Sequence, residues 1–267
     1  MAKTSFRVTA SFLLILTMSL MQIACEESPT STEAQQPVPP PLSSMQTDFS
    51  LFTGGSQSMA KAQIFTKQHF IAAAATVTLV NAAVIVHMAL PVVLFGQAVN
   101  QDVEFQNDGK FHWIFSNDMY TSDLAGWIDV DNAESVWEMY YTQGQNFNDF
   151  LWFMGRCNFD GTEGEWVFNH LAIPDAYTQL LRIDWTNNAE DDRTLDFTII
   201  LDGDPARGDK LSYIVDGTSR NVQYYDASAA TTAMIAWDAV TGAGYIQMPN
   251  YNNGQPGYWD ENQNDLP

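Results

Sequence analysis

Between residues 103 and 250 the sequence repeats one pattern, in which short segments of alternating apolar and polar residues are separated by turn-forming residues. Most links are two to eight residues long. Such links are too short for crossover connections, so sequential strands should pair antiparallel. Four links carry Asp-Gly, a pair typical of tight turns because glycine readily takes positive φ. The pattern predicts a sheet of about ten strands. Eleven segments are candidates for them: 111–116, 124–130, 135–142, 149–159, 164–170, 180–186, 194–201, 210–217, 221–227, 233–239 and 244–250.

A second feature is a stretch without charge. Residues 68–101 contain no Asp, Glu, Lys or Arg, and residues 70–90 also lack Gly and Pro. This 21-residue core is long enough for a transmembrane helix. However, it is only moderately apolar and its flanking charges oppose the positive-inside rule. We therefore expect a helix at about 59–90, buried in the folded domain and ended or kinked by Pro91.

Together these features predict a mainly β (α+β) fold. We expect a single folded domain at 59–250, in which a curved antiparallel meander sheet or half-barrel of about ten strands, over about 103–250, is wrapped around one long apolar helix. Burial of that helix would supply a large part of the stability. Residues 251–267 are predicted to form a polar C-terminal tail.

The N-terminus reads as an export signal. Lys3 and Arg7 precede an apolar run at 12–23, and Ala24 then stands before Cys25. This segment resembles the signal and acylation site of bacterial lipoproteins. The resemblance implies removal of residues 1–24 and lipidation of Cys25. It also favours a lipid-anchored cell-envelope location, in the outer rather than the inner membrane.

Residues 25–58 are rich in Ser, Thr, Gln and Pro and include the run PVPPP. Such a composition cannot bury enough apolar area to offset the chain entropy lost on folding. We therefore expect the lipidated Cys25 to be followed by a flexible tether up to residue 58.

The order of elements, a long helix followed by an antiparallel meander, is similar to that of the periplasmic lipoprotein-carrier superfamily. That resemblance covers residues 60–250 loosely and rests on element order rather than on a motif. It implies an open half-barrel with helices as a lid, whose concavity holds acyl chains. No functional residue of that family is carried over to a position of this sequence.

The charge balance excludes one class of partner. The chain has 11 Lys and Arg against 32 Asp and Glu, a net charge of −21. Nucleic acid is therefore not expected as a partner, because phosphate binding needs a basic surface. Electrostatic docking on an anionic lipid surface is disfavoured for the same reason.

Motifs that carry chemistry are missing from the sequence. It contains no nucleophile elbow, P-loop, HExxH or CxxC motif. Cys157 is expected to be a buried small apolar residue, and the carboxylate pairs Glu163/Glu165 and Asp191/Asp192 to be solvated. A calcium loop at 202–209 is a weaker alternative to a plain hairpin loop. We predict no catalytic residue, no metal site and no cofactor. The four histidines lack metal-ligand spacing: His69, His87, His112 and His170.

These observations favour a non-enzymatic, lipid-anchored envelope protein that serves as a structural or interaction module. Its partner would be a protein or a hydrophobic ligand. Two alternatives stay open. All eight Trp residues lie between 113 and 259, so exposed Trp and Tyr rings could bind glycans. An envelope hydrolase with an unrecognised acidic site is the other alternative.

Overall fold

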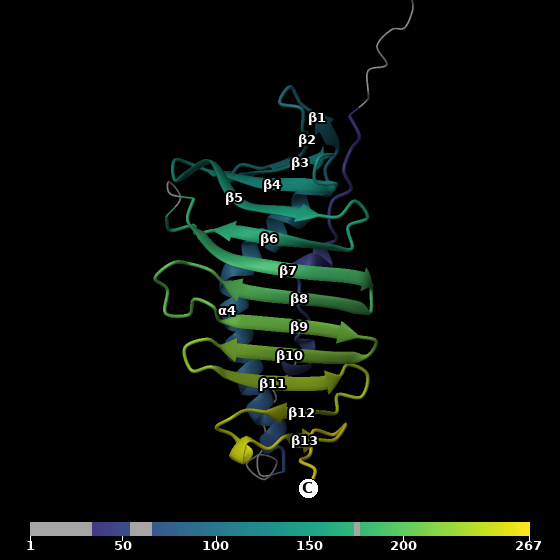
Figure 1. Cartoon of the computed structure of the whole chain (residues 1–267), viewed down its shortest axis with the longest axis vertical. Coiled ribbons are helices and arrows are strands. Elements are labelled where there is room, and N and C mark those ends of the chain that lie inside the picture. The colour runs from purple at the N-terminus through teal and green to yellow at the C-terminus, as the bar shows by residue number, and fades with distance from the viewer. Residues whose placement is uncertain (1–33, 54–65, 174–176) are drawn as a thin grey trace, which may run out of the picture. The chain divides into compact units, whose positions relative to one another are not determined.

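In the described part of the chain, thirteen strands form one antiparallel sheet, and each pairs with its neighbours in sequence (Figure 1). The computed structural model describes residues 34–53, 66–173 and 177–267, without the side chains of 81–86. Residues 36–267 form one compact unit, to which this description refers. The strands are β1 (Val103–Phe105), β2 (Phe111–Ser116), β3 (Thr121–Asp129), β4 (Glu134–Gln143), β5 (Phe147–Cys157), β6 (Glu163–Asn169), β7 (Gln179–Ala189), β8 (Asp192–Ile199), β9 (Lys210–Asp216), β10 (Ser219–Asp226), β11 (Thr231–Asp238), β12 (Gly244–Gln247) and β13 (Gly257–Trp259).

The predicted mainly β class and antiparallel meander are confirmed, but the sheet has thirteen strands rather than about ten. Alternation could not reveal β1 and β13, which have three residues each. The four Asp-Gly links do form turns, and their glycines all have positive φ: Gly109, Gly161, Gly203 and Gly217. Among the described residues β1 does not pair with β13, so the sheet is open.

The bounds predicted for the helix were wrong. Helix α4 spans Gln68–Ala98 and continues through Pro91. Proline removes one hydrogen bond of the helix, but Pro91 is buried and the residues on both sides of it remain helical. Residues 59–65 of the predicted helix lie outside the described residues. Among those described, no helix combines the length and hydropathy needed to cross a membrane.

The start of α4 is fixed from the other end of the chain. Asp265 accepts hydrogen bonds from the backbone N–H groups of Gln68 and His69, each at 2.9 Å. A carboxylate at this position satisfies free donors of the first turn and interacts favourably with the helix dipole. The predicted polar tail at 251–267 is therefore corrected. Its residues form β13 and a 3-10 turn, η3 (Asn252–Gly254), and its Trp259 is buried.

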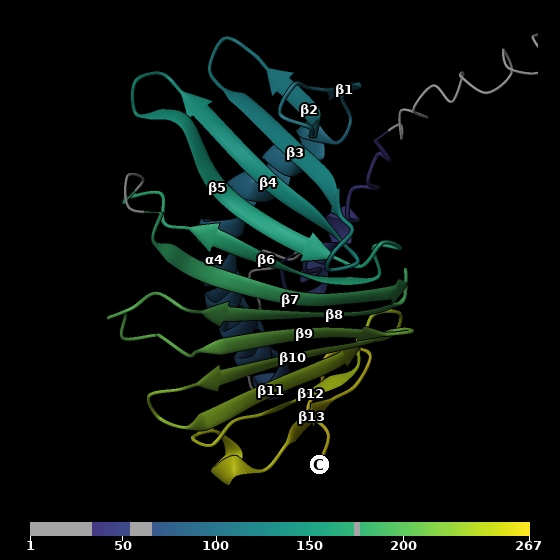
Figure 2. The ribbon, with the colours of Figure 1, turned by 45° about the horizontal axis from the view of Figure 1, so that its top comes forward.

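Helix α4 crosses the strands on one face of the sheet (Figures 1 and 2). It contacts β12 and β13 at one end of the sheet and β2 and β3 at the other. At 1.5 Å per residue its 31 residues extend over about 46 Å. The helix therefore runs along the whole face of the sheet, and its two ends make most of its contacts with the strands.

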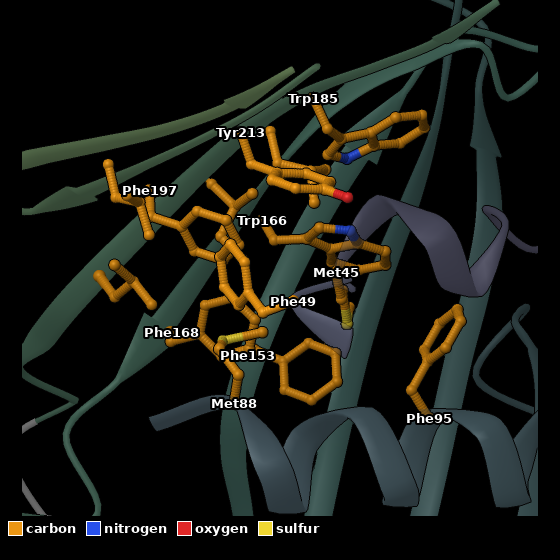
Figure 3. Close-up of a cluster of buried hydrophobic side chains, with 14 of the residues drawn as sticks. Met45, Phe49, Met88, Phe95, Phe153, Trp166, Phe168, Trp185, Phe197 and Tyr213 are labelled. Carbon is orange, nitrogen blue, oxygen red and sulfur yellow. The ribbon is translucent and has the colours of Figure 1, made fainter. Parts of the chain in front are cut away.

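The space between helix and sheet is filled largely by aromatic side chains. Met88 of α4 lies beside Phe153 and Phe168 of the sheet (Figure 3). Farther along the helix, the Phe95 ring packs edge-on against Trp166 with centroids 5.5 Å apart. Burial of these rings is a main source of stability, because each removes a large apolar area from water.

The predicted flexible tether is also corrected in part. Residues 42–53 form two short helices, η1 (Leu42–Ser44) and α2 (Ser50–Thr53), that belong to the core. Met45, Phe49 and Phe52 are buried there. The Trp166 indole N–H donates to Ser44 Oγ at 3.0 Å. A Ser- and Pro-rich segment can be ordered in this way because three large apolar side chains anchor it.

Several tryptophan rings lie flat over glycines of the neighbouring strand. Trp137 pairs with Gly126 and Trp166 with Gly155, each across one step of the sheet. A Cβ built on Gly155 would lie 2.3 Å from the Trp166 ring and 2.8 Å from a backbone oxygen. Only glycine leaves room for the ring, so these positions tie the backbone to the aromatic core.

We predict that Gly155→Ala destabilises the protein by about 1–3 kcal/mol, because the buried Trp166 ring must move. Gly96→Ala, within α4, is the matched control, since a Cβ on Gly96 would lie 3.7 Å from the Leu42 side chain, an ordinary van der Waals distance. That substitution should stabilise by about 0.5–1 kcal/mol, as in other helices. Urea unfolding followed by circular dichroism measures both, and equal midpoints would contradict the packing argument.

Candidate functional site

A cleft of about 320 Å3 lies between α4 and strands β7–β10. Its floor is apolar and comes from one face of the sheet. Phe197, Leu211 and Tyr224 are register partners on β8, β9 and β10, and Leu181 of β7 adds to the same surface. Leu181 is the partner of Ile199, which lies two residues from Phe197 on β8. Register partners, and residues two apart on one strand, project on the same side of the sheet, so the four side chains form a continuous patch.

The helix side of the cleft is formed by Val80 and His87. These residues are seven apart, so they lie on one side of α4, two turns from each other. The rim opposite comes from two connections between strands. His170 lies after β6, while Asp204 and Asp209 lie between β8 and β9.

Hydrogen bonds fix the rim carboxylates. Asp209 accepts the Tyr224 hydroxyl at 2.5 Å and the Ala227 backbone N–H at 2.9 Å. Burial and the adjacent Asp209 carboxylate raise the pKa of Tyr224 above its usual value, so Tyr224 stays neutral and donates. Asp204 accepts the backbone N–H of Ala206 at 2.8 Å, which orders the loop beside the cleft.

The two histidines face the same space. Partial burial lowers the pKa of His87 below 6.5, repulsion from His170 lowers it further, and Asp204 partly offsets both. The His170 Nδ1 accepts the Ala172 backbone N–H at 3.0 Å, so the proton of the neutral ring lies on Nε2. With His87 neutral, the cleft joins an apolar floor to a rim dominated by two carboxylates.

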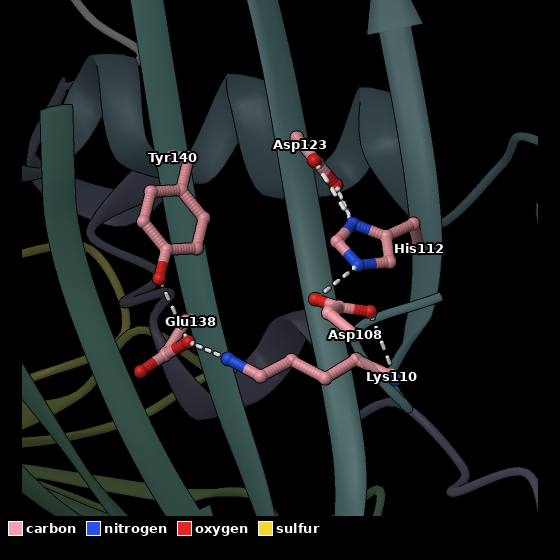
Figure 4. Close-up of polar contacts among 6 residues, drawn as sticks. All are labelled: Asp108, Lys110, His112, Asp123, Glu138 and Tyr140. Carbon is pink, nitrogen blue, oxygen red and sulfur yellow. Dashed lines mark hydrogen bonds and ion pairs between the residues drawn. The ribbon is translucent and has the colours of Figure 1, made fainter. Parts of the chain in front are cut away.

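A second polar cluster lies across β2, β3 and β4 (Figure 4). The buried His112 places Nδ1 2.9 Å from both oxygens of Asp123 and Nε2 3.2 Å from Asp108 Oδ2. Glu138 Oε2 lies 2.5 Å from the Lys110 ammonium and accepts the Tyr140 hydroxyl at 2.9 Å.

Each charged group in this cluster has a partner on a neighbouring strand or turn. Burial raises the pKa of Asp123, and the hydrogen bond from His112 opposes that change. The arrangement cross-links three strands, so we interpret it as a structural contact.

A polar hollow of about 490 Å3 lies at one end of strands β5–β8. Glu163, Glu165 and Asp184 line it together with Arg156. Its Arg156 pairs with Glu134, and Asp184 pairs with Arg182. Arg156 and Asp184 are thus paired with neighbours outside this set, whereas the cleft beside α4 presents an uncovered apolar floor.

The structure brings together only some of the residues considered in the sequence. His87 and His170 meet at the cleft, whereas His69 bonds the Tyr251 hydroxyl at 2.7 Å. In the 202–209 loop Asp202 pairs with Arg207, while Asp204 and Asp209 bind other partners. Among the residues that the structure describes, no three potential ligands are grouped as a metal site would require.

Cys157 is buried, and burial raises the pKa of its thiol. This agrees with its interpretation as a small apolar residue, because a reactive cysteine needs an exposed thiolate. Cys25 lies outside the described residues, so its lipidation remains a prediction. The sequence did not indicate Leu181, Phe197, Leu211 and Tyr224 as a floor. The alternation of apolar and polar residues places these side chains on one face of the sheet. It does not show which part of that face α4 leaves uncovered.

Comparison with known proteins yields no further assignment. The chain matches no protein-family model, no curated protein and no solved structure.

We predict that Tyr224→Phe destabilises the protein by about 1–3 kcal/mol, because Asp209 loses a hydroxyl donor in a partly buried position. Tyr225→Phe is the control, since Tyr225 is the next residue on the same strand and is exposed. Thermal unfolding of the two variants should separate them, and equal transition temperatures would show that the hydrogen bond contributes nothing.

Proposed function

We propose that this protein is a lipid-anchored bacterial envelope protein that binds the apolar part of a small amphipathic ligand and is not an enzyme. The observation that carries the proposal is the cleft between α4 and β7–β10. The signal-like N-terminus and Cys25 support the anchor, and several acyl chains on one cysteine would make it effectively permanent.

The dimensions of the cleft limit the ligand. Sites for small molecules usually enclose about 300–1,000 Å3, and this cleft, at about 320 Å3, is at the lower end. It suits a single short alkyl chain or a compact ring system rather than a lipid with several chains. Each methylene group that leaves water contributes about 0.8 kcal/mol.

The curvature proposed for the sheet belongs to the same hypothesis. A half-barrel with α4 across its concave face would explain why the helix contacts the strands at both ends of the sheet. Most of that concavity is occupied by aromatic rings and by residues 42–53. In our proposal the open cleft is what remains of the acyl-chain space that the lipoprotein-carrier resemblance implies.

The alternative of glycan binding receives less support. It requires exposed Trp and Tyr rings. Three tyrosines are exposed, but they lie on different elements: Tyr177, Tyr225 and Tyr258. Seven of the eight Trp side chains are buried: Trp113, Trp137, Trp152, Trp166, Trp185, Trp237 and Trp259. Stacking on a sugar needs an accessible ring face, which these positions do not offer.

The cleft is tested by filling it. We expect Ala206→Trp to weaken binding of a dodecyl-chain probe at least tenfold, because a bulky ring on the cleft lining occupies the apolar space. Ala229→Trp, at an exposed turn, should leave binding within twofold. Calorimetric titration measures the affinities, and native mass spectrometry of the purified full chain detects a retained ligand. Equal binding by both variants would place the site elsewhere, and no binding by the unmodified protein would reject the proposal.

The rim predicts selectivity for the head group. Asp204 and Asp209 and the net charge of −21 favour a cationic or neutral head over an anionic one. We expect dodecyltrimethylammonium to bind about tenfold more tightly than dodecanoate at low salt, with dodecyl maltoside between them. Asp204→Asn should narrow that ratio without abolishing binding. Equal affinities for the three probes would retain the cleft but reject the role of its charge.

A further inference from the structure

On the face of α4 that points away from the sheet, the described side chains are mainly apolar and exposed. Leu79 is 75% exposed, Val93 49% and Leu90 40%, and Ala75 and Ala89 are also exposed. No charged residue occurs between positions 68 and 101. A helix face that meets water normally carries charged or polar side chains, so this one lacks its expected partner.

The exposed residues follow the spacing of a helix–helix contact. Ala75 and Ala89 are fourteen residues apart, as are Leu79 and Val93. Fourteen residues are two heptads, so each pair occupies equivalent positions of a seven-residue repeat. The step of four from Ala75 to Leu79 recurs from Ala89 to Val93. Together the four residues define a seam along α4 that stays within about 40° of Ala75 around the helix.

The same positions are symmetric about residue 84. Ala75 precedes it by nine residues and Val93 follows it by nine, while Leu79 and Ala89 lie five residues away on either side. An antiparallel copy of the helix would therefore place Ala75 opposite Val93 and Leu79 opposite Ala89, with small residues facing larger ones. A two-fold axis requires a surface that is complementary to itself in this way.

We propose that α4 pairs antiparallel with the α4 helix of a second copy of this chain through the seam of Ala75, Leu79, Ala89 and Val93. The charge distribution favours this partner. Two chains of net charge −21 repel each other, and the uncharged helix face is where they can approach without bringing acids together.

The geometry also limits the strength of pairing. The seam from Ala75 to Val93 is about 27 Å long. Two helices in contact along it at an interaxial distance of about 8–10 Å bury at most on the order of 1,000 Å2 in total. This is near the lower limit of specific interfaces, so we expect a weak dimer. A lipid surface is a less suitable occupant, because interfacial helices typically combine aromatic residues with Lys or Arg. This seam has neither.

Disulfide trapping in the full chain tests both the partner and its direction. In cells, the double variant Leu79→Cys/Ala89→Cys should form a covalent dimer, read on a non-reducing gel. Leu79→Cys alone should not, because an antiparallel pair separates the two copies of residue 79 by about 15 Å, beyond the reach of a disulfide. Val240→Cys, at an exposed turn position, is the control for random collision. A dimer from Leu79→Cys alone would overturn the antiparallel direction, and no dimer from the folded double variant would overturn the proposal.

An independent measurement uses a charge. Leu79→Asp should weaken association of the full chain at least tenfold in sedimentation experiments, while Val240→Asp should leave it unchanged. Circular dichroism confirms that both variants fold. If the unmodified protein is monomeric at all concentrations, or if Leu79→Asp associates as well as Val240→Asp, the seam is not an interface between copies.

Discussion

The fold depends on the packing of α4 and residues 42–53 against the aromatic face of the sheet. A meander of thirteen strands produces one long apolar face, which must be covered for the sheet to be stable in water. One helix covers it lengthwise, and Met45, Phe49 and Phe52 fill the space between helix and strands. Most other features depend on how completely α4 and residues 42–53 cover the apolar face of the sheet. The Gly–Trp pairs let the rings lie flat, and Asp265 fixes where the helix starts.

Incomplete closure accounts for both proposals. Because α4 contacts mainly the strands at the two ends of the sheet, the side chains between its middle and β7–β10 leave an opening. The sheet covers only the side of α4 that faces it, so the opposite side of the helix remains exposed. If that side met only water, we would expect charged side chains on it, and α4 has none.

The sequence predicted the local features better than the long-range ones. Alternation and Asp-Gly turns located eleven of the strand positions, because both signals depend on adjacent residues. The start of α4 was missed because its cap, Asp265, is 197 residues from Gln68 in sequence. The composition of residues 42–53 predicts a flexible tether, but Met45, Phe49 and Phe52 supply three large apolar side chains to the core and so order the segment. The cleft could not be predicted, because Val80 and Tyr224 are far apart in sequence and come together only when the whole sheet has packed against α4.

The cleft and the seam can operate together because they use different sides of α4. At 100° per residue, His87 lies about 120° and Val80 about 140° around the helix from Ala75. Pairing through the seam would therefore leave the cleft open. The two sites would still share one rigid helix whose position relative to β7–β10 sets the width of the cleft. If pairing shifts α4, it must change ligand affinity by the same factor by which the ligand changes pairing. Equal affinities in the free and the disulfide-trapped protein would instead mean that contacts at both ends of the sheet hold α4 in place.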